Sequence, residues 1–154
     1  MINKKTTPRT QGEISFISNE LLEIFGDRLT SVVLFGSYAR KNNTEDSDMD
    51  IIAIVDEYNN EDISSLRRSF LMAFERKLDL HVFTKEQIVE NFRTLSPMFV
   101  TLLLGKRVLF DRNCFFSEQY LKFIKKMSNQ KIKYCEGGKI WEMQKVAQNL
   151  KNSL

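Results

Sequence analysis

The stretch from Leu34 to Val55, LFGSYARKNNTEDSDMDIIAIV, decides what kind of fold this chain adopts. An apolar run rich in β-branched and aromatic residues ends at Gly36-Ser37, and a second apolar run follows Asp48-Met49-Asp50. Such runs predict two strands of a sheet that is covered on both faces. Because side chains alternate along a strand, Asp48 and Asp50 are expected to point to the same face. The stretch therefore predicts a buried sheet with two carboxylates at the mouth of one strand.

Helices and two further strands are predicted around this stretch from the spacing of apolar residues and from capping residues. Residues 1–12 are polar and are expected to form a loose arm. The predicted helices cover residues 13–29, 63–78, 85–95, 98–104 and 115–128, and the predicted strands cover residues 31–36, 48–55, 78–84 and 106–111. A last helix is predicted after Gly137-Gly138, with apolar residues at Ile140, Met143, Ala147, Leu150 and Leu154. Its spacing suits docking on the domain or pairing with a partner helix.

This order of elements predicts an α/β (α+β) domain with a mixed central sheet of about four strands flanked by helices. We expect the domain to cover residues 13–111 and a basic helical C-terminal extension, residues 112–154, to pack on it. The extension carries 9 Lys and Arg against 3 Asp and Glu, whereas the first 111 residues carry 14 against 17. Such asymmetry is typical of a solvated lysine-rich helix, with an anionic partner such as RNA as the alternative.

The composition is that of a globular protein, with 42% hydrophobic and 28% charged residues in a chain of 154. No apolar run approaches the ~20 residues that span a bilayer, and the N-terminus lacks the apolar segment of a secretory signal. Cys114 and Cys135 have neither CxxC nor zinc-ligand spacing, so two reduced cysteines are expected. These features predict a cytoplasmic protein that needs no membrane.

A third carboxylate follows on the next predicted strand, where Asp79 interrupts an apolar run and His81, the only histidine, falls on the same face. If that strand lies beside the strand of Asp48 and Asp50, three carboxylates converge at one end of the sheet. Carboxylates that close repel one another unless a cation lies between them. Mg²⁺ prefers such oxygen ligands and shares them with substrate phosphates, so the residues predict a two-metal phosphoryl or nucleotidyl transfer site.

Gly36 and Ser37 fit the same chemistry from the other strand. A strand that ends in glycine lets backbone N–H groups approach phosphate oxygens, and Ser37 adds a hydroxyl donor. Arg40 and Lys41 bring positive charge within a turn of the pair. These residues predict a binding site for the phosphates of a nucleotide.

Gly36-Ser37, ten intervening residues and Asp48-Met49-Asp50 resemble the GS-x10-DxD signature of the polymerase-β-like nucleotidyltransferase superfamily. The similarity is closest to its minimal nucleotidyltransferases, and Asp79 falls where that family has its third carboxylate. The resemblance implies the polymerase-β-like fold over roughly Glu13 to Asp111. Lys41 stands where many members have glycine, followed by Asn42 and Asn43, which tolerate unusual φ angles.

The resemblance also implies the reaction and the role of each residue. An NMP unit, most often AMP from ATP, would pass to a hydroxyl acceptor. Asp48, Asp50 and Asp79 would be catalytic and would hold two Mg²⁺ ions, with Mn²⁺ as the alternative ion. Gly36, Ser37 and Arg40 would bind the nucleotide, and His81 is predicted either to pack near the site or to contact substrate.

For the acceptor, the minimal family implies first a tyrosine of a HEPN-domain toxin, which such antitoxins silence by adding AMP. A small molecule such as an aminoglycoside is the alternative acceptor. A different class, a silent module that binds its partner without catalysis, also stays open, as does an RNA-directed transferase using the basic extension. The sequence does not decide the nucleotide preference, and it leaves a homo-oligomer open.

Overall fold

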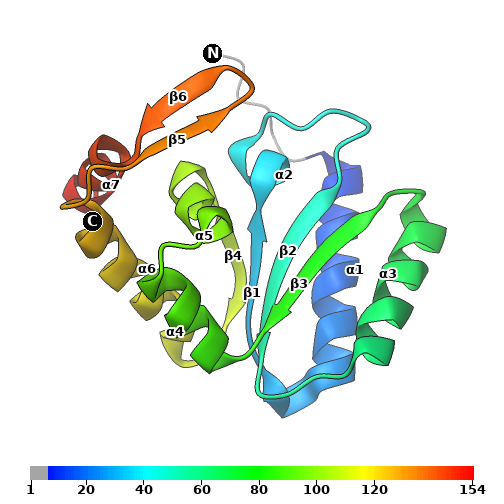
Figure 1. Cartoon of the computed structure of the whole chain (residues 1–154). Coiled ribbons are helices and arrows are strands. Elements are labelled where there is room, and N and C mark those ends of the chain that lie inside the picture. The colour runs from blue at the N-terminus through cyan, green and yellow to red at the C-terminus, as the bar shows by residue number, and fades with distance from the viewer. Residues whose placement is uncertain (1–6) are drawn as a thin grey trace.

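The computed structural model describes residues 7–154, and its centre is a four-stranded mixed sheet in the order β3-β2-β1-β4 (Figure 1). The strands are β1 (Leu29–Phe35), β2 (Met49–Val55), β3 (Leu78–Phe83) and β4 (Arg107–Asp111). β1 pairs antiparallel with β2 and β4, while β2 and β3 run parallel. The predicted α+β class and mixed four-stranded sheet are confirmed.

Helices cover both faces of the sheet, as the continuous apolar runs of β1 and β2 require. One face is covered by α1 (Pro8–Phe25) and α3 (Asn60–Phe74) (Figure 1). The other is covered by α4 (Lys85–Arg93), α5 (Pro97–Thr101), α6 (Phe115–Met127) and α7 (Met143–Asn152). Short 3₁₀ turns occupy Gly26–Arg28, Leu102–Leu104 and Arg112–Cys114. Within residues 7–154, no helix is both long and apolar enough to cross a membrane.

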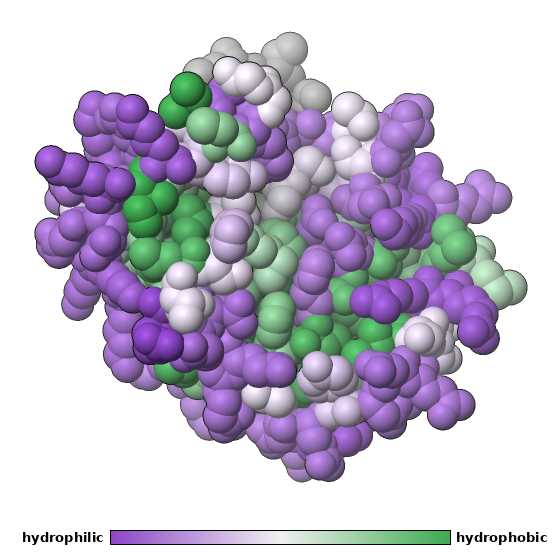
Figure 2. Space-filling model, viewed as in Figure 1, coloured by the Kyte–Doolittle hydropathy of each residue, from purple (hydrophilic) through white to green (hydrophobic). Residues whose placement is uncertain are grey.

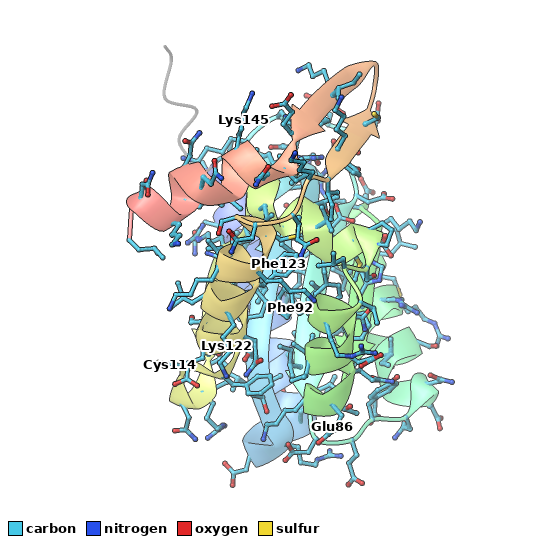
Figure 3. The ribbon with its side chains drawn as sticks, turned by 60° about the vertical axis from the view of Figure 1, so that its left-hand side comes forward. Glu86, Phe92, Cys114, Lys122, Phe123 and Lys145 are labelled. Carbon is cyan, nitrogen blue, oxygen red and sulfur yellow. The ribbon has the colours of Figure 1, made fainter. Side chains whose placement is uncertain are left out.

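The core is divided by the sheet into two apolar clusters. The first joins Ile17 and Leu21 of α1 and Phe70 of α3 to one face of the sheet. In the second, Phe92 of α4 and Phe123 of α6 point toward one another, with ring centroids 4.7 Å apart (Figure 3). Fully burying side chains of this size contributes about 1.5–3 kcal/mol each to the stability of the sheet and its covering helices.

Capping residues place the helix starts. The Thr7 hydroxyl accepts from the Thr10 N–H, so α1 begins at Pro8, and the Asn59 side chain accepts from the Asp62 N–H at the start of α3. Residues 8–12 are therefore helical, which corrects the predicted loose arm; its residues 1–6 lie outside the described part of the chain. Leu29 and Leu78, predicted at helix ends, belong to β1 and β3 instead.

The C-terminal region contains a β-hairpin that the sequence prediction missed. β5 (Lys133–Glu136) and β6 (Lys139–Glu142) pair antiparallel around Gly137-Gly138, whose φ angles of 56° and 75° suit a two-residue turn. The predicted last helix is shorter than expected, because Ile140 lies in β6 and is 66% exposed. α7 begins at Met143, and its Met143 and Ala147 are buried in the second cluster.

The hairpin and α2 (Gly36–Arg40) lie at the same end of the sheet (Figure 1). Hydrophilic residues cover most of this face of the molecule, and paler and hydrophobic residues are visible between them near its centre (Figure 2). In Figure 1 no helix lies in front of the upper parts of β2 and β3. At this end of the sheet, the side chains of Asp79 and His81 are 42% and 33% exposed.

Candidate active site

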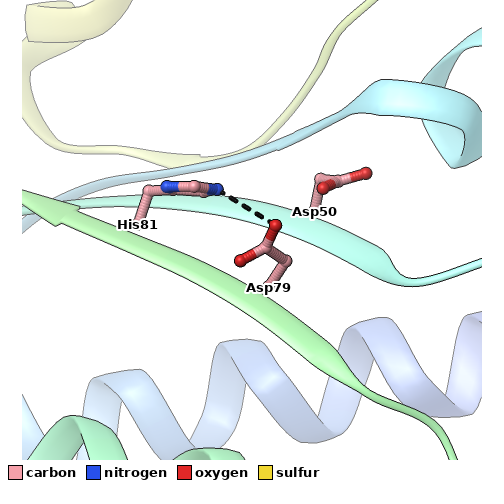
Figure 4. A group of neighbouring side chains, drawn as sticks. All are labelled: Asp50, Asp79 and His81. Atoms are coloured by element: carbon pink, nitrogen blue, oxygen red, sulfur yellow. Dashed lines mark ion pairs between the residues drawn. The ribbon is translucent and has the colours of Figure 1, made fainter. Parts of the chain in front are cut away.

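The sheet register brings two of the three predicted carboxylates together. β2 and β3 are parallel, and Asp50 lies directly opposite Asp79. Both side chains project to the same side of the sheet, together with His81 (Figure 4). One ligand atom from each of these three residues lies within 4.8 Å of the other two. Three groups able to bind a metal ion therefore meet on neighbouring strands.

His81 belongs to this cluster. Its Nε2 lies 3.5 Å from Asp79 Oδ2 (Figure 4). Its ring centroid lies 5.7 Å from that of Phe35. The sequence predicted that His81 lies on the same face as Asp79, but it did not predict that a ring nitrogen of His81 lies near the carboxylates. Side chains alternate along a strand, so Asp79 and His81, two residues apart on β3, project to the same face.

Asp48 is not one of this group of three, although its charge also raises the pKa of Asp50. It precedes β2, which begins at Met49, and its Oδ2 lies 3.5 Å from Lys77 Nζ. The alternation of side chains along a strand does not extend to a residue in the preceding loop. The structure therefore brings Asp50 and Asp79 together and leaves Asp48 beside them, paired with a lysine and 43% exposed.

The electrostatics of Asp50 fit a cation site. Burial, and then the neighbouring charge of Asp79, raise the pKa of Asp50 to about 6, although His81 and Arg40 act in the opposite direction. Without a positive partner, an ionised Asp50 is thus unfavourable. A divalent cation would relieve this repulsion, and carboxylate oxygens are the ligands that hard divalent ions prefer. The residues present therefore fit a divalent metal.

Gly36 touches the cluster through its backbone. Its φ is 68°, which favours glycine, and a Cβ atom added there would lie 2.2 Å from Asp50 Oδ2. α2 begins at Gly36, directly after β1, so the first turn of a short helix faces the carboxylate of Asp50. No other residue type fits this position without moving Asp50.

A cavity of about 270 Å³ adjoins these residues. It is lined by Phe35, Gly36, Ser37, Arg40, Asp50, Thr101, Tyr134 and Glu136. The three predicted nucleotide-binding residues thus share one cavity with Asp50. Thr101, Tyr134 and Glu136 were not predicted, because α5 and the hairpin reach the site only through the tertiary fold.

The hairpin is tied to α2 at this cavity. Arg40 Nη1 donates to Glu136 Oε2 over 3.1 Å, and the Arg40 side chain is 20% exposed. A Cβ at Gly105 would lie 2.9 Å from Arg40 Cγ, so the segment before β4 also packs against this arginine. Arg40 is therefore confined between the hairpin and the start of β4.

Lys41 ends α2 in the left-handed conformation, with φ 59° and ψ 32°. Many members of the family that the sequence resembles have glycine at this position. Glycine is the preferred residue where a helix ends in the left-handed conformation. The unusual backbone thus falls on Lys41 itself, and neither Asn42 nor Asn43 has a positive φ.

The fold, the paired carboxylates and the glycine turn define an enzyme of the nucleotidyltransferase type. The family model named for the nucleotidyltransferase domain matches residues 14–135, and the chain belongs to that family. The resemblance read from the sequence is confirmed at this level. The match runs past Asp111 into β5, so the family similarity is longer than the resemblance had implied.

A relative from Methanocaldococcus jannaschii, provisionally named a protein adenylyltransferase, is 30% identical over 107 residues, which are 66% of this chain and 71% of the relative. Among solved structures, one of a tri-AMPylated HEPN toxin of Shewanella oneidensis in complex with an MNT antitoxin contains a similar chain. It has TM-score 0.50 and 18% identity, over 75% of this chain and 84% of that chain. A spectinomycin adenyltransferase of Enterococcus faecialis has TM-score 0.55 and 12% identity, over 77% of this chain and 65% of that chain. At these identities the solved structures establish a shared fold.

Proposed function

We propose that this protein transfers AMP from ATP to a hydroxyl group of a protein acceptor, a tyrosine of a HEPN-type toxin. The observation that carries the proposal is the convergence of Asp50 and Asp79 beside the backbone of Gly36. This arrangement joins a metal-binding group to a turn suited to phosphate. The protein relative that is provisionally named a protein adenylyltransferase favours a protein as acceptor.

In this proposal, Asp50 and Asp79 supply the inner oxygen ligands, and Asp48 adds a third after exchanging its contact with Lys77. Two Mg²⁺ ions held there would lower the pKa of the acceptor hydroxyl and neutralise the leaving pyrophosphate. Gly36 and Ser37 bind the β- and γ-phosphates through backbone N–H groups and the hydroxyl. Arg40 adds a positive charge to the same cavity.

The reaction balances without any further reactant. The acceptor oxygen attacks the α-phosphorus, the bond from the α-phosphorus to the bridging oxygen breaks, and pyrophosphate leaves. Asp79 takes the proton of the acceptor hydroxyl and passes it to solvent. His81 Nε2 lies 3.5 Å from Asp79 Oδ2, so its imidazole is placed to pair with that carboxylate when it is protonated.

Thermal unfolding tests the metal-nucleotide site. ATP with Mg²⁺ or Mn²⁺ should raise the melting temperature of the wild type, because a ligand that binds only the native state stabilises it by mass action. Asp50→Asn should abolish this shift. Lys122→Gln, on the solvent side of α6 in Figure 3, is the matched control and should respond like the wild type. An equal shift in Asp50→Asn would remove the metal site from the proposal.

Transfer of label from α-labelled ATP identifies the acceptor. The protein is incubated with the HEPN-domain product of an adjacent gene, with spectinomycin, and with RNA. Label on the HEPN protein that disappears when its tyrosine is replaced by phenylalanine supports the proposal. Label on spectinomycin or RNA would instead make the protein a small-molecule or RNA transferase. Binding of the HEPN protein without label on any acceptor would favour a silent binding module.

A further inference from the structure

A buried ion pair lies behind the candidate site, on the face of the sheet covered by α1. Glu13 of α1 is 0% exposed, and Arg76, in the bend between α3 and β3, has a side chain that is 10% exposed. Arg76 Nε donates to Glu13 Oε1 over 2.9 Å. The two residues are far apart in sequence, and no motif pointed to either of them.

The same guanidinium also binds the loop that leads to Asp48 and Asp50. Arg76 Nη1 donates to the backbone oxygen of Glu45 over 3.0 Å and to that of Ser47 over 2.8 Å. Its Cζ lies 5.2 Å from the ring centroid of Tyr38, in α2. One side chain therefore contacts both the helix that starts at Gly36 and the turn that precedes the carboxylates.

The loop has few other attachments. Asn42 N–H donates to Ser37 O, and a turn from Thr44 to Ser47 is closed by its own hydrogen bonds. Across residues 7–154, Arg76 provides the hydrogen bonds that join residues 43–47 to the rest of the chain. The position of the turn before Asp48 therefore depends on Arg76.

Stability alone does not explain this pair. Desolvating two charges costs several kcal/mol, and an apolar pair of similar size is often equally stable or more stable. Glu13 Oε2 is moreover buried without a hydrogen-bond partner among the described residues. What an apolar pair cannot supply is the planar set of donors that reaches one carboxylate and two carbonyl oxygens together.

We propose that Arg76, anchored by Glu13, is a positioning residue that fixes the 43–47 loop and thereby places Asp48 and Asp50 for metal binding. This inference rests on the proposed function, since it concerns the same carboxylates. Arg76 touches neither substrate nor metal and acts through the loop. Outer residues that orient metal ligands typically change metal affinity by about 10- to 100-fold when they are replaced.

The decisive variant is the double substitution Glu13→Leu with Arg76→Met, which fills the space and leaves no buried charge unpaired. We expect its melting temperature to stay near that of the wild type, while amide hydrogen exchange accelerates in residues 43–47. Binding of Mn²⁺, measured by calorimetry, should weaken by about tenfold or more. Arg76→Lys keeps the charge but not the planar donors, so its loop exchange and its Mn²⁺ affinity should lie between those of the wild type and the double variant. It also tests the inference if the double variant does not fold.

Arg112→Met is the matched control. Arg112 also donates to backbone oxygens, those of Leu29 and Gly26, but at the end of β1 remote from Gly36. Its loss should lower the melting temperature and leave both the loop exchange and Mn²⁺ binding unchanged. If amide hydrogen exchange in residues 43–47 is as slow in the double variant and in Arg76→Lys as it is in the wild type, the inference is wrong. Absence of Mn²⁺ binding by the wild type would instead contradict the proposed function. The exchange measurement would still test whether Arg76 holds the 43–47 loop in place.

Discussion

Replacing Gly36 by alanine should damage activity far more than stability. The φ of 68° places an alanine in the left-handed region, which costs about 1–2 kcal/mol. The new Cβ would also lie 2.2 Å from Asp50 Oδ2 and 2.9 Å from its Cγ, so the carboxylate must move by close to 1 Å to reach the 3.0 Å that real Cβ contacts respect. A misplacement of ~1 Å in a reacting geometry costs about 10²-fold in rate.

The control for Gly36→Ala is Gly26→Ala. Gly26 has a φ of 53°, and a Cβ there would meet no atom within 4 Å. Chemical denaturation should show a loss of stability in both variants, because both positions have a positive φ that alanine adopts only with strain. AMP transfer, measured with labelled ATP at saturating metal, should fall about 10²-fold in Gly36→Ala alone. Equal activity in the two variants would refute the argument that Gly36 is required by its contact with Asp50.

Three further predictions concern the same end of the sheet. Because burial and Asp79 raise the pKa of Asp50 from 3.8 to about 6, the metal-free protein should lose stability as the pH rises between these two values. Asp50→Asn should therefore melt above the wild type at pH 8 and approach it as the pH falls to about 4, and a constant difference would contradict this. Glu136→Gln releases Arg40 from a half-exposed ion pair and should lower the KM for ATP about two- to fivefold, the equivalent of 0.5–1 kcal/mol; a raised KM would show that the pair helps binding. Lys41→Gly should raise the free energy of unfolding by about 0.5–1 kcal/mol in urea titrations, since glycine removes the left-handed strain at some cost in chain entropy. Any loss of stability would show that Lys41 is not strained.

The parts of the fold that follow from local pattern could be predicted from the sequence. The strand around Asp50, the strand around Asp79 and the cap at Asn59 depend on residues close together in the chain. Element ends were less predictable. Leu78 continues the apolar spacing of α3, but Glu75 ends that helix in the left-handed conformation, which the periodicity of apolar residues does not reveal.

The parts of the site that depend on long-range contacts could not be predicted. The hairpin strands are four residues each and mostly exposed, so they lack the alternation that marks a strand, and Gly137-Gly138 is equally typical of a break between helices. Glu136 reaches Arg40 across 96 positions, and Arg76 reaches Glu13 across 63. Nothing local to these residues distinguishes them from solvated surface charges.

The carboxylates also bear on how the sheet selects its register. Ile51 and Ile52 of β2 are both fully buried, on opposite faces, so apolar burial alone does not penalise a shift of one residue. Asp50 and Asp79 do penalise it, because a shift of either strand would turn the carboxylate of that strand into the core between the sheet and α1. An unpaired carboxylate in such a core is strongly unfavourable. The native register is therefore the one in which both carboxylates face the open end of the sheet, and the residues proposed to bind metal help to specify the strand pairing that brings them together.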